Sequence, residues 1–193
     1  MRSSLLPADT ARLLAGMPAR WWVAGGWAID LWLGRATRNH DDLDIAILRS
    51  EQWVVRAHLE EWDLRLAHEG ELTPLKADDQ VDPPLHALWC RRYPGDAWAF
   101  ELLLNDTSGE EWLFRRDHHV RRPIEELGST DHDGIPFLSP EVVLLFKAKN
   151  RRNHDEADFS RALPRLEPAQ RRWLSDSIQR VHPGHEWIER IGV

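Results

Sequence analysis

Residues 22–47 constrain the fold of this chain more than any other stretch: WVAGGWAIDLWLGRATRNHDDLDIAI. An aromatic and β-branched run stops at Gly25 and Gly26, which indicates a short strand that passes directly into a helix. A second run, opened by Asp42 and Asp44, alternates polar and apolar residues in the manner of a strand. Ionised carboxylates at the start of a buried strand are costly unless something pairs with them. The stretch therefore predicts a strand–helix–strand unit with a charged site at its edge.

The two aspartates suggest a metal site. The strand period of two places Asp42 and Asp44 on one face and Leu43 and Ile45 on the other. Two carboxylates about 7 Å apart along a strand need a cation to stay ionised in a low-dielectric site. Mg²⁺ supplies that charge and takes oxygen ligands, which it shares with substrate phosphates. A solvated strand start, where aspartates cost little, is the simpler explanation of the pattern by itself.

The glycine pair suggests a phosphate site. A strand, then Gly25 and Gly26, then a helix expected over residues 27–34 aims unpaired backbone N–H groups outward. Such helix N-termini bind phosphate through those donors and the helix dipole. A tight turn without a ligand is the alternative. Together, the glycines and the two aspartates describe a site for a metal-bound triphosphate.

A third carboxylate stands in an apolar strand expected within residues 97–106. Glu101 is the charged residue inside that run, and a lone buried glutamate needs a partner or a function. If this strand neighbours the one at residues 42–48, Glu101 faces Asp42 and Asp44. It can then ligate a metal or take a proton from an attacking hydroxyl. A solvent-exposed glutamate on an edge strand is the alternative.

The C-terminal part offers a charged helix face. A helix that runs unbroken from residue 139 would align four charged side chains: Lys147, Arg151, Asp155 and Asp158. In one interpretation Lys147 contacts the triphosphate and Asp155 or Asp158 orients it. In the other, the face is a surface ladder of ion pairs that adds little stability. Lys149 points about 200° away from Lys147 around the helix, so Lys147 is the preferred candidate.

The expected fold class is α/β (α+β), a mixed sheet flanked by helices with a helical C-terminal segment. We expect a core over residues 1–133 and the helical segment, packed on it, over residues 134–193. Other expected elements are helices at 7–18, 51–62, 155–163 and 168–181, and strands at 20–26 and 85–93.

Composition narrows the function classes. A net charge of −7 argues against a general nucleic-acid binder and suits a small cationic substrate. No apolar run approaches the roughly 20 residues of a membrane span. The single cysteine, Cys90, cannot form an internal disulfide, so a reducing cytoplasm is expected. No Walker A motif is present.

The stretch GGWAIDLWLGRATRNHDDLDIAI resembles the start of the aminoglycoside 2″-adenylyltransferases and the related lincosamide nucleotidyltransferases. These belong to the polymerase-β-like nucleotidyltransferase superfamily. The segment GIPFLSPEVVLLFKAKNRRNHDEADF, residues 134–159, is more loosely similar to the Pro-Glu, Lys and Asp-x-x-Asp segment of the same group. The resemblance implies that Gly25 and Gly26 hold nucleotide phosphates and that Asp42 and Asp44 bind Mg²⁺. Glu101 falls where relatives place a third carboxylate, as metal ligand or general base.

The resemblance also covers two residues near the glycines and the aspartates. Trp27 stands where many members have serine, so a hydroxyl contact to phosphate is missing while the backbone N–H contact survives. Arg38 precedes the metal strand and can neutralise phosphate or leaving pyrophosphate. The implied enzyme uses two Mg²⁺ ions and moves AMP from ATP to a hydroxyl of a small molecule, with an aminoglycoside-type acceptor as the hypothesis.

Three other functions fit the same residues. The first is a toxin-like or regulatory nucleotidyltransferase that acts on tRNA or protein. The second is a catalytically silent nucleotide-binding module, and the third is a phosphatase-like metal hydrolase whose water attack leaves no adduct.

Overall fold

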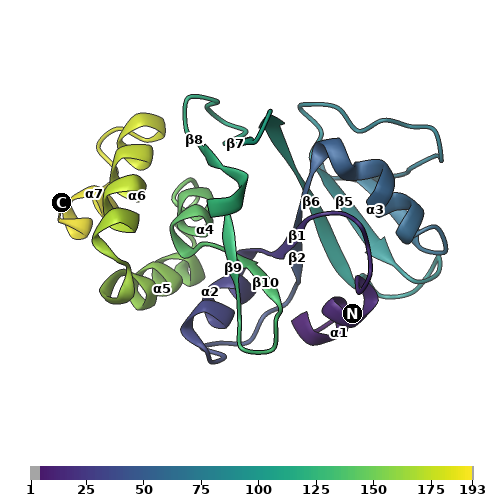
Figure 1. Ribbon diagram of the computed structural model, residues 1–193, viewed down its shortest axis with the longest axis horizontal. Helices are drawn as coiled ribbons and strands as arrows, with labels where there is room; N and C mark the ends of the chain where they lie inside the picture. The colour runs from purple at the N-terminus through teal and green to yellow at the C-terminus, as the bar shows by residue number, and fades with distance from the viewer. Residues whose placement is uncertain (1–4, 193) are drawn as a thin grey trace.

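A mixed β-sheet forms the centre and one end of the molecule, and helices form the other end (Figure 1). The computed structural model describes residues 5–192. The strand order is β4-β3-β5-β6-β2-β1-β10-β9. The bounds of these eight strands, in chain order, are β1 Trp21–Val23, β2 Asp44–Leu48, β3 Asp63–His68, β4 Glu71–Pro74, β5 Ala87–Arg91, β6 Phe100–Ser108, β9 Gly128–Thr130 and β10 Pro136–Leu138. Two short strands extend from the end of β6, namely β7 Glu111–Leu113 and β8 Arg121–Pro123.

The predicted strand–helix–strand unit lies at the centre of this sheet. Strand β1 passes into helix α2, Gly25–Leu33, and β2 then pairs antiparallel with β1, with Val23 opposite Ile45. Four of the five β2 residues are buried, because sheet neighbours flank the strand and helices cover it. Helix α2 begins two residues earlier than expected, and its first residue, Gly25, has a φ of +61°. That backbone conformation strains any residue with a Cβ.

Strands β2 and β6 are parallel neighbours, and their register fixes the candidate site. Asp44 lies opposite Glu101, and Glu101 lies opposite Trp89 on the antiparallel neighbour β5. Residues directly opposite each other on neighbouring strands present their side chains on the same face. The expectation that the Glu101 strand adjoins the aspartate strand is confirmed.

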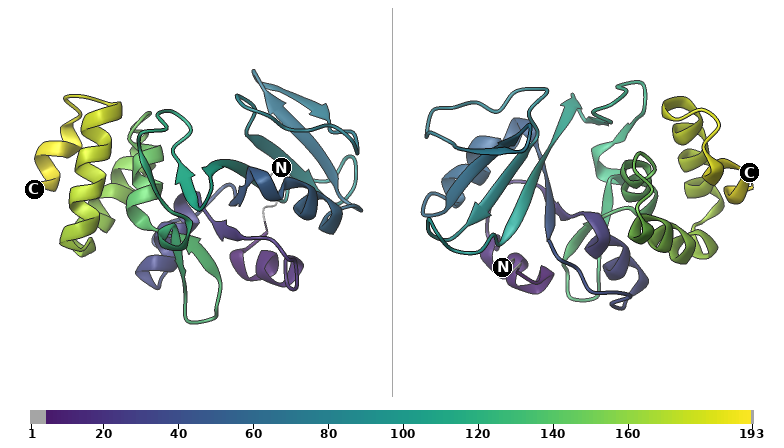
Figure 2. Two further views of the ribbon diagram at one scale, coloured as in Figure 1. Left: turned by 45° about the horizontal axis from the view of Figure 1, so that its top comes forward. Right: turned by 180° about the vertical axis from the view of Figure 1, so that it is seen from behind.

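Helices cover the sheet in two groups. Helix α1, Pro7–Leu13, and helix α3, Gln52–His58, accompany the end of the sheet that carries β3 and β5, while the C-terminal helices gather at the opposite end (Figures 1 and 2). The latter are α4 Pro140–Lys147, α5 Asn153–Ala162, α6 Pro168–Val181 and α7 Glu186–Ile191. The apolar helix α4 packs against α2 and α6, so the C-terminal helices share a continuous core with the strand–helix–strand unit.

The condition for one shared charged face, a helix that runs unbroken from residue 139 through Asp158, is not met. Helix α4 ends at Lys147, and α5 starts at Asn153 after a turn in which Arg151 has a φ of +48°. The carboxylate of Asp155 accepts a hydrogen bond from the backbone N–H of Arg152 at 3.1 Å, which caps the new helix. Lys147 and Asp155 therefore meet across a break between two helices and not by spacing along one.

Other boundaries also differ from expectation. The strand expected at 42–48 begins at Asp44, so Asp42 lies in the approach to the strand, although the backbone carbonyl of Leu43 already accepts from the N–H of Glu101. The helix expected over 51–62 ends at His58, and that over 7–18 ends at Leu13. The hairpin of β3 and β4 and the short strands β7 to β9 have no counterpart in the sequence-based expectation.

The architecture is an α+β fold with a mixed sheet, as expected. Strand β10 pairs parallel with β1, so the sheet continues past residue 134 and the helical part starts at Pro140. The division of the chain at 133/134 stays a prediction. Among the described helices, none is both long and apolar enough to cross a membrane.

Candidate active site

A cavity of about 340 Å³ lies between the sheet and the C-terminal helices, and most of the predicted site residues line it. Those that line it are Gly25, Gly26, Arg38, Asp42, Asp44, Glu101 and Lys147. Trp27 is not among the described residues of the lining. Its ring stacks on His40 at a centroid distance of 4.3 Å. The part of Trp27 that belongs to the phosphate-binding hypothesis is its backbone N–H in the first turn of α2.

The carboxylates come from two neighbouring strands. Asp44 and Glu101 are in register on β2 and β6, and Asp42 precedes β2 at the exposed rim of the same cavity. Burial and the charge of Asp42 raise the pKa of Asp44 from 3.8 to about 6, while Lys147 and Arg152 act in the opposite direction. A carboxylate that resists ionisation beside a second one favours a bound cation.

The N-terminus of α2 adjoins these carboxylates. A Cβ on Gly25 would overlap the carboxylate of Asp44, and a Cβ on Gly26 would overlap the guanidinium of Arg38 and the ring of His40. These side chains approach the backbone so closely that both positions leave no room for a Cβ in this arrangement. The same arrangement brings the unpaired N–H groups of the first helical turn to the wall of the cavity.

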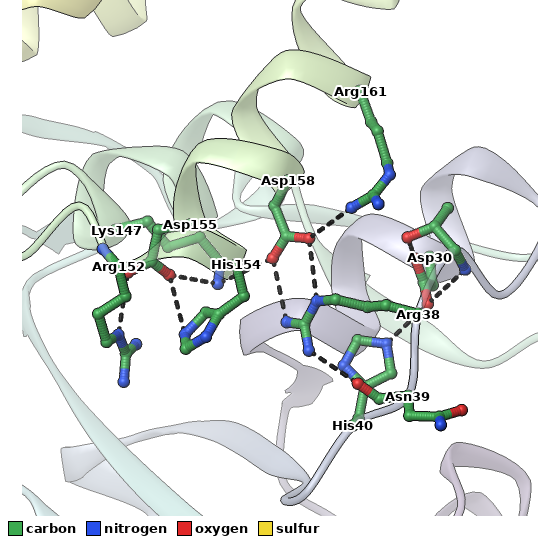
Figure 3. A network of polar contacts seen from close by, with 11 residues as sticks. Asp30, Arg38, Asn39, His40, Lys147, Arg152, His154, Asp155, Asp158 and Arg161 are labelled. Atoms are coloured by element: carbon green, nitrogen blue, oxygen red, sulfur yellow. Dashed lines mark hydrogen bonds and ion pairs between the residues drawn. The ribbon is translucent and has the colours of Figure 1, made fainter.

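A buried ion-pair network joins the segment after α2 to helix α5 (Figure 3). Both nitrogens of the Arg38 fork lie 3.1 Å from the carboxylate oxygens of Asp158. The ammonium of Lys147 lies 2.9 Å from Asp155 Oδ1 and 3.0 Å from Asp158 Oδ2. The Asp155 and Asp158 side chains are 0% exposed, so this is not the surface ladder considered above.

The network sets the ionisation of both carboxylates. Burial alone would raise the pKa of Asp158, but the hydrogen bond from Arg38 and the charge of Lys147 outweigh burial and lower it. Hydrogen bonds from Arg152 and Lys147 lower the pKa of Asp155 in the same way. Lys147 lies at the cavity wall, whereas Lys149 is exposed and absent from the lining among the described residues.

A second polar cluster, which the sequence analysis did not single out, anchors the segment that carries Arg38. The buried carboxylate of Asp30 lies 2.6 Å from Nε2 of His40 and accepts from the backbone N–H of Thr37 at 3.0 Å. His40 in turn stacks on Trp27. These contacts fix the loop that leads to Asp42. An acid and a histidine ten positions apart, in a helix and a loop, give no periodic signal in the sequence.

The cavity is also lined by basic residues that sequence reasoning missed. They are the arginines Arg115, Arg116 and Arg152 and the histidines His86 and His154. The adjacent arginines Arg115 and Arg116 stand in a loop between two strands that were not predicted, so nothing marked them as site residues. The arrangement as a whole combines carboxylate oxygens with cationic side chains and helix N–H groups, which is the chemistry of a metal-bound polyphosphate.

Solved structures with the same architecture support the fold. The lincosamide antibiotic adenylyltransferase LnuA, solved with lincomycin bound, matches with a TM-score of 0.54 at 17% identity, covering 79% of this chain and 91% of that one. ANT(2″)-Ia in complex with adenylyl-2″-tobramycin matches with a TM-score of 0.50 at 18% identity, covering 96% and 93%. At such identities the likeness extends to the fold alone.

Curated proteins match over shorter segments. A 2″-aminoglycoside nucleotidyltransferase from Klebsiella pneumoniae is 46% identical over 39 residues, which is 20% of this chain and 22% of that protein. One from Escherichia coli is 67% identical over 24 residues, 12% and 14% of the two chains. The matches thus span about a fifth of the length of these relatives or less.

The profile of one family matches far more of the chain. It is described as aminoglycoside-2″-adenylyltransferase, and it covers residues 8–161, from helix α1 to the end of α5. This range contains every candidate site residue described above. By this match, and in agreement with its fold, the chain belongs to the aminoglycoside-2″-adenylyltransferase family.

Proposed function

We propose that this protein is a nucleotidyltransferase that moves AMP from ATP to a hydroxyl of a small molecule. One observation carries the proposal: Asp44 and Glu101 lie side by side on parallel strands, with Asp42 beside them and the N-terminus of α2 at the same cavity. Membership of the family supports it. Phosphoryl transfer depends on positioning and charge neutralisation more than on covalent catalysis, and this cavity offers both.

The residues present fit a magnesium site. The donor set consists of carboxylate oxygens, which Mg²⁺ prefers. Burial, together with the charge of Asp42, raises the pKa of Asp44, and a bound cation would offset both causes. Asp42, Asp44 and Glu101 would hold two ions, with Glu101 as ligand or base. When bound, Mg²⁺ neutralises charge on the α-phosphate and lowers the pKa of a bound hydroxyl.

The chain's own groups would handle the nucleotide and the proton. The N–H groups at Gly25, Gly26 and Trp27 and the ammonium of Lys147 would bind phosphate oxygens, with Arg38 close to them. The acceptor oxygen forms a bond to the α-phosphorus, and the bond from that phosphorus to pyrophosphate breaks. Glu101 can take the proton that the hydroxyl loses.

An aminoglycoside-type acceptor is the leading substrate class, and the relatives named for aminoglycosides support it. A small niche beside the carboxylates adds acidic and aromatic groups: Asp41, Asp42 and Glu101 line it together with the edge-to-face pair Trp89 and Trp98, and the guanidinium of Arg91 lies over the Trp98 ring. Carboxylates attract ammonium groups, and aromatic faces stack on sugars or attract cations. A cytoplasmic location fits the lone, buried thiol of Cys90.

The direct test is product formation. Incubation with each of the four NTPs, Mg²⁺ and a panel of aminoglycosides and lincosamides should give an adduct heavier by one nucleoside monophosphate, read by mass spectrometry. Asp42→Asn should lower turnover at least ~100-fold with little loss of fold, because it removes a charged metal ligand. Free monophosphate without adduct would instead indicate a hydrolase, and nucleotide binding without turnover would indicate a silent module.

The raised pKa of Asp44 predicts an unusual stability change. Because the pKa is higher in the folded chain than in the unfolded one, the group's stabilising contribution is present below about pH 4 and is lost as the pH rises to about 6. Asp44→Asn should therefore raise the unfolding free energy of the metal-free protein at pH 7, by about 1–3 kcal/mol. Denaturant titrations at pH 4 and 7 measure it, and a less stable variant at pH 7 contradicts it.

Glu101→Gln separates a general base from a metal ligand. Loss of a pure base lowers turnover ~10²–10⁴-fold and leaves nucleotide affinity nearly unchanged. Loss of a ligand weakens the binding of Mg²⁺ with a non-hydrolysable ATP analogue as well, which calorimetry detects. Unchanged turnover and unchanged binding would place Glu101 outside the site.

Lys147→Ala should raise the KM for ATP at least ~10-fold, because Lys147 is the ammonium at the cavity wall. Lys149→Ala is the matched control, since Lys149 is exposed two residues away, and it should leave the kinetics unchanged. Lys147 also pairs with Asp155 and Asp158, so thermal unfolding of both variants must accompany the kinetics. Equal KM values in folded Lys147→Ala and wild type would remove the residue from nucleotide binding.

A further inference from the structure

The cations of the cavity fall into two classes. Arg38, Lys147 and Arg152 each form an ion pair with Asp155 or Asp158 of helix α5. Their charge is therefore largely compensated before any ligand binds. The second class consists of Arg115 and Arg116, which follow β7 in the loop to β8 and line the same cavity.

Arg115 and Arg116 form no ion pair with a carboxylate anywhere in residues 5–192. Arg116 donates one N–H to the backbone carbonyl of Phe146 at 3.2 Å and lies over the rings of Phe114 and Phe146, at 5.5 and 5.6 Å from their centroids. These contacts hold the guanidinium in place but leave its charge without a counter-ion. Two such neighbours are notable in a chain with a net charge of −7.

The nearby acids are committed elsewhere. The carboxylate of Asp106 bonds the Nε of Arg49, whose Nη1 also donates to the carbonyls of Val81 and Leu85 at 2.8 Å each. Asp117, in the same loop as the two arginines, accepts from Arg180 of helix α6 at 2.8 Å. Both acids are therefore paired with other arginines, and although the charge of Asp106 raises the pKa of Arg115, burial outweighs it and lowers that pKa.

Burial lowers the pKa values of the basic groups around Arg115 and Arg116. Burial, together with the charge of Arg115, lowers the pKa of Arg116 from 12.5 to about 10. Burial lowers the pKa of the neighbouring His86 as well, and the charges of Arg115 and Arg49 contribute. A site for an oxyanion needs positive charge and free N–H donors. Two adjacent guanidinium groups supply both, because their N–H groups match the geometry of phosphate oxygens.

We propose that Arg115 and Arg116 form a binding site for an anionic phosphate group in the wall of this cavity. This site goes beyond the phosphate contacts assigned above to Lys147, Arg38 and the glycines, and the origin of the phosphate rests on the proposed function. Arg116 is anchored on Phe146, which directly precedes Lys147. A polyphosphate held by Lys147 can therefore extend to Arg116, and a separate inorganic phosphate ion is the other source of the same chemistry.

Binding of inorganic anions tests the site without any turnover. Calorimetry with inorganic tripolyphosphate in the presence of Mg²⁺ should show at least ~10-fold weaker binding for Arg115→Gln, and again for Arg116→Gln. The control is Arg121→Gln on the adjacent strand β8, because Arg121 is exposed and pairs with the half-exposed Glu111. Since Arg116 packs on two phenylalanines, Arg116→Lys and thermal unfolding separate lost anion binding from lost folding.

Inorganic phosphate then identifies the source. If a non-hydrolysable ATP analogue abolishes phosphate binding in wild type, the nucleotide's own phosphates occupy the site. If phosphate still binds with the analogue present, and the Arg115→Gln protein loses that binding, the site takes a phosphate ion separate from the nucleotide. Unchanged binding of both anions in folded Arg115→Gln and Arg116→Gln proteins overturns the inference. It would leave the proposed transfer reaction, which is read by product mass, untouched.

Discussion

The parallel pairing of β2 with β6 is the constraint on which the candidate site depends. Sheet geometry sets neighbouring strands about 5 Å apart, so register alone brings the carboxylates of Asp44 and Glu101 together on one face. The same pairing supplies the rest of the site, because Leu103 and Asn105 continue along β6 as the floor of the cavity. A slip by one residue would turn Glu101 into the core and Leu102 toward the cavity. The buried Leu102 and Leu104, which alternate with the half-buried Glu101 and Leu103, oppose such a slip.

The second organising feature is the pair of fully buried carboxylates on α5. Charges taken out of water are costly unless their partners are well placed, and Asp155 and Asp158 obtain theirs from three different segments: Arg38, Lys147 and Arg152. Removal of any one cation would leave a buried charge partly uncompensated. The network therefore ties the position of the segment before Asp42 to the position of α5. The shape of the cavity follows from that tie.

Sequence reasoning recovered the parts of this site that rest on local pattern. The stretch with Gly25, Gly26, Asp42 and Asp44 shows strand and turn signals, and Glu101 is conspicuous in an apolar run. Where tertiary contacts decide, the prediction failed. A separate helix at 155–163 was expected, but the end of α4 at Lys147 depends on the capping of α5 by Asp155 and on a left-handed residue at Arg151, and neither is visible in the spacing of the charges. Arg115 and Arg116 lie in a loop whose position is set by β7 and β8, strands of three residues each, which are too short to show a period.

The charged side chains of the cavity are unfavourable in the ligand-free protein. Burial and the charge of Asp42 disfavour the ionised form of Asp44, and burial and the charge of Arg115 disfavour the charged form of Arg116. The pKa of Asp44 stays raised although the charges of Lys147 and Arg152 act against the shift, and both of these cations already pair with Asp155. A metal-bound polyphosphate carries the complementary pattern, with cations that satisfy the aspartates and oxyanions that satisfy the arginines. The folded chain thus holds its polar groups in place in advance, so that their interaction energy becomes available when the ligands bind.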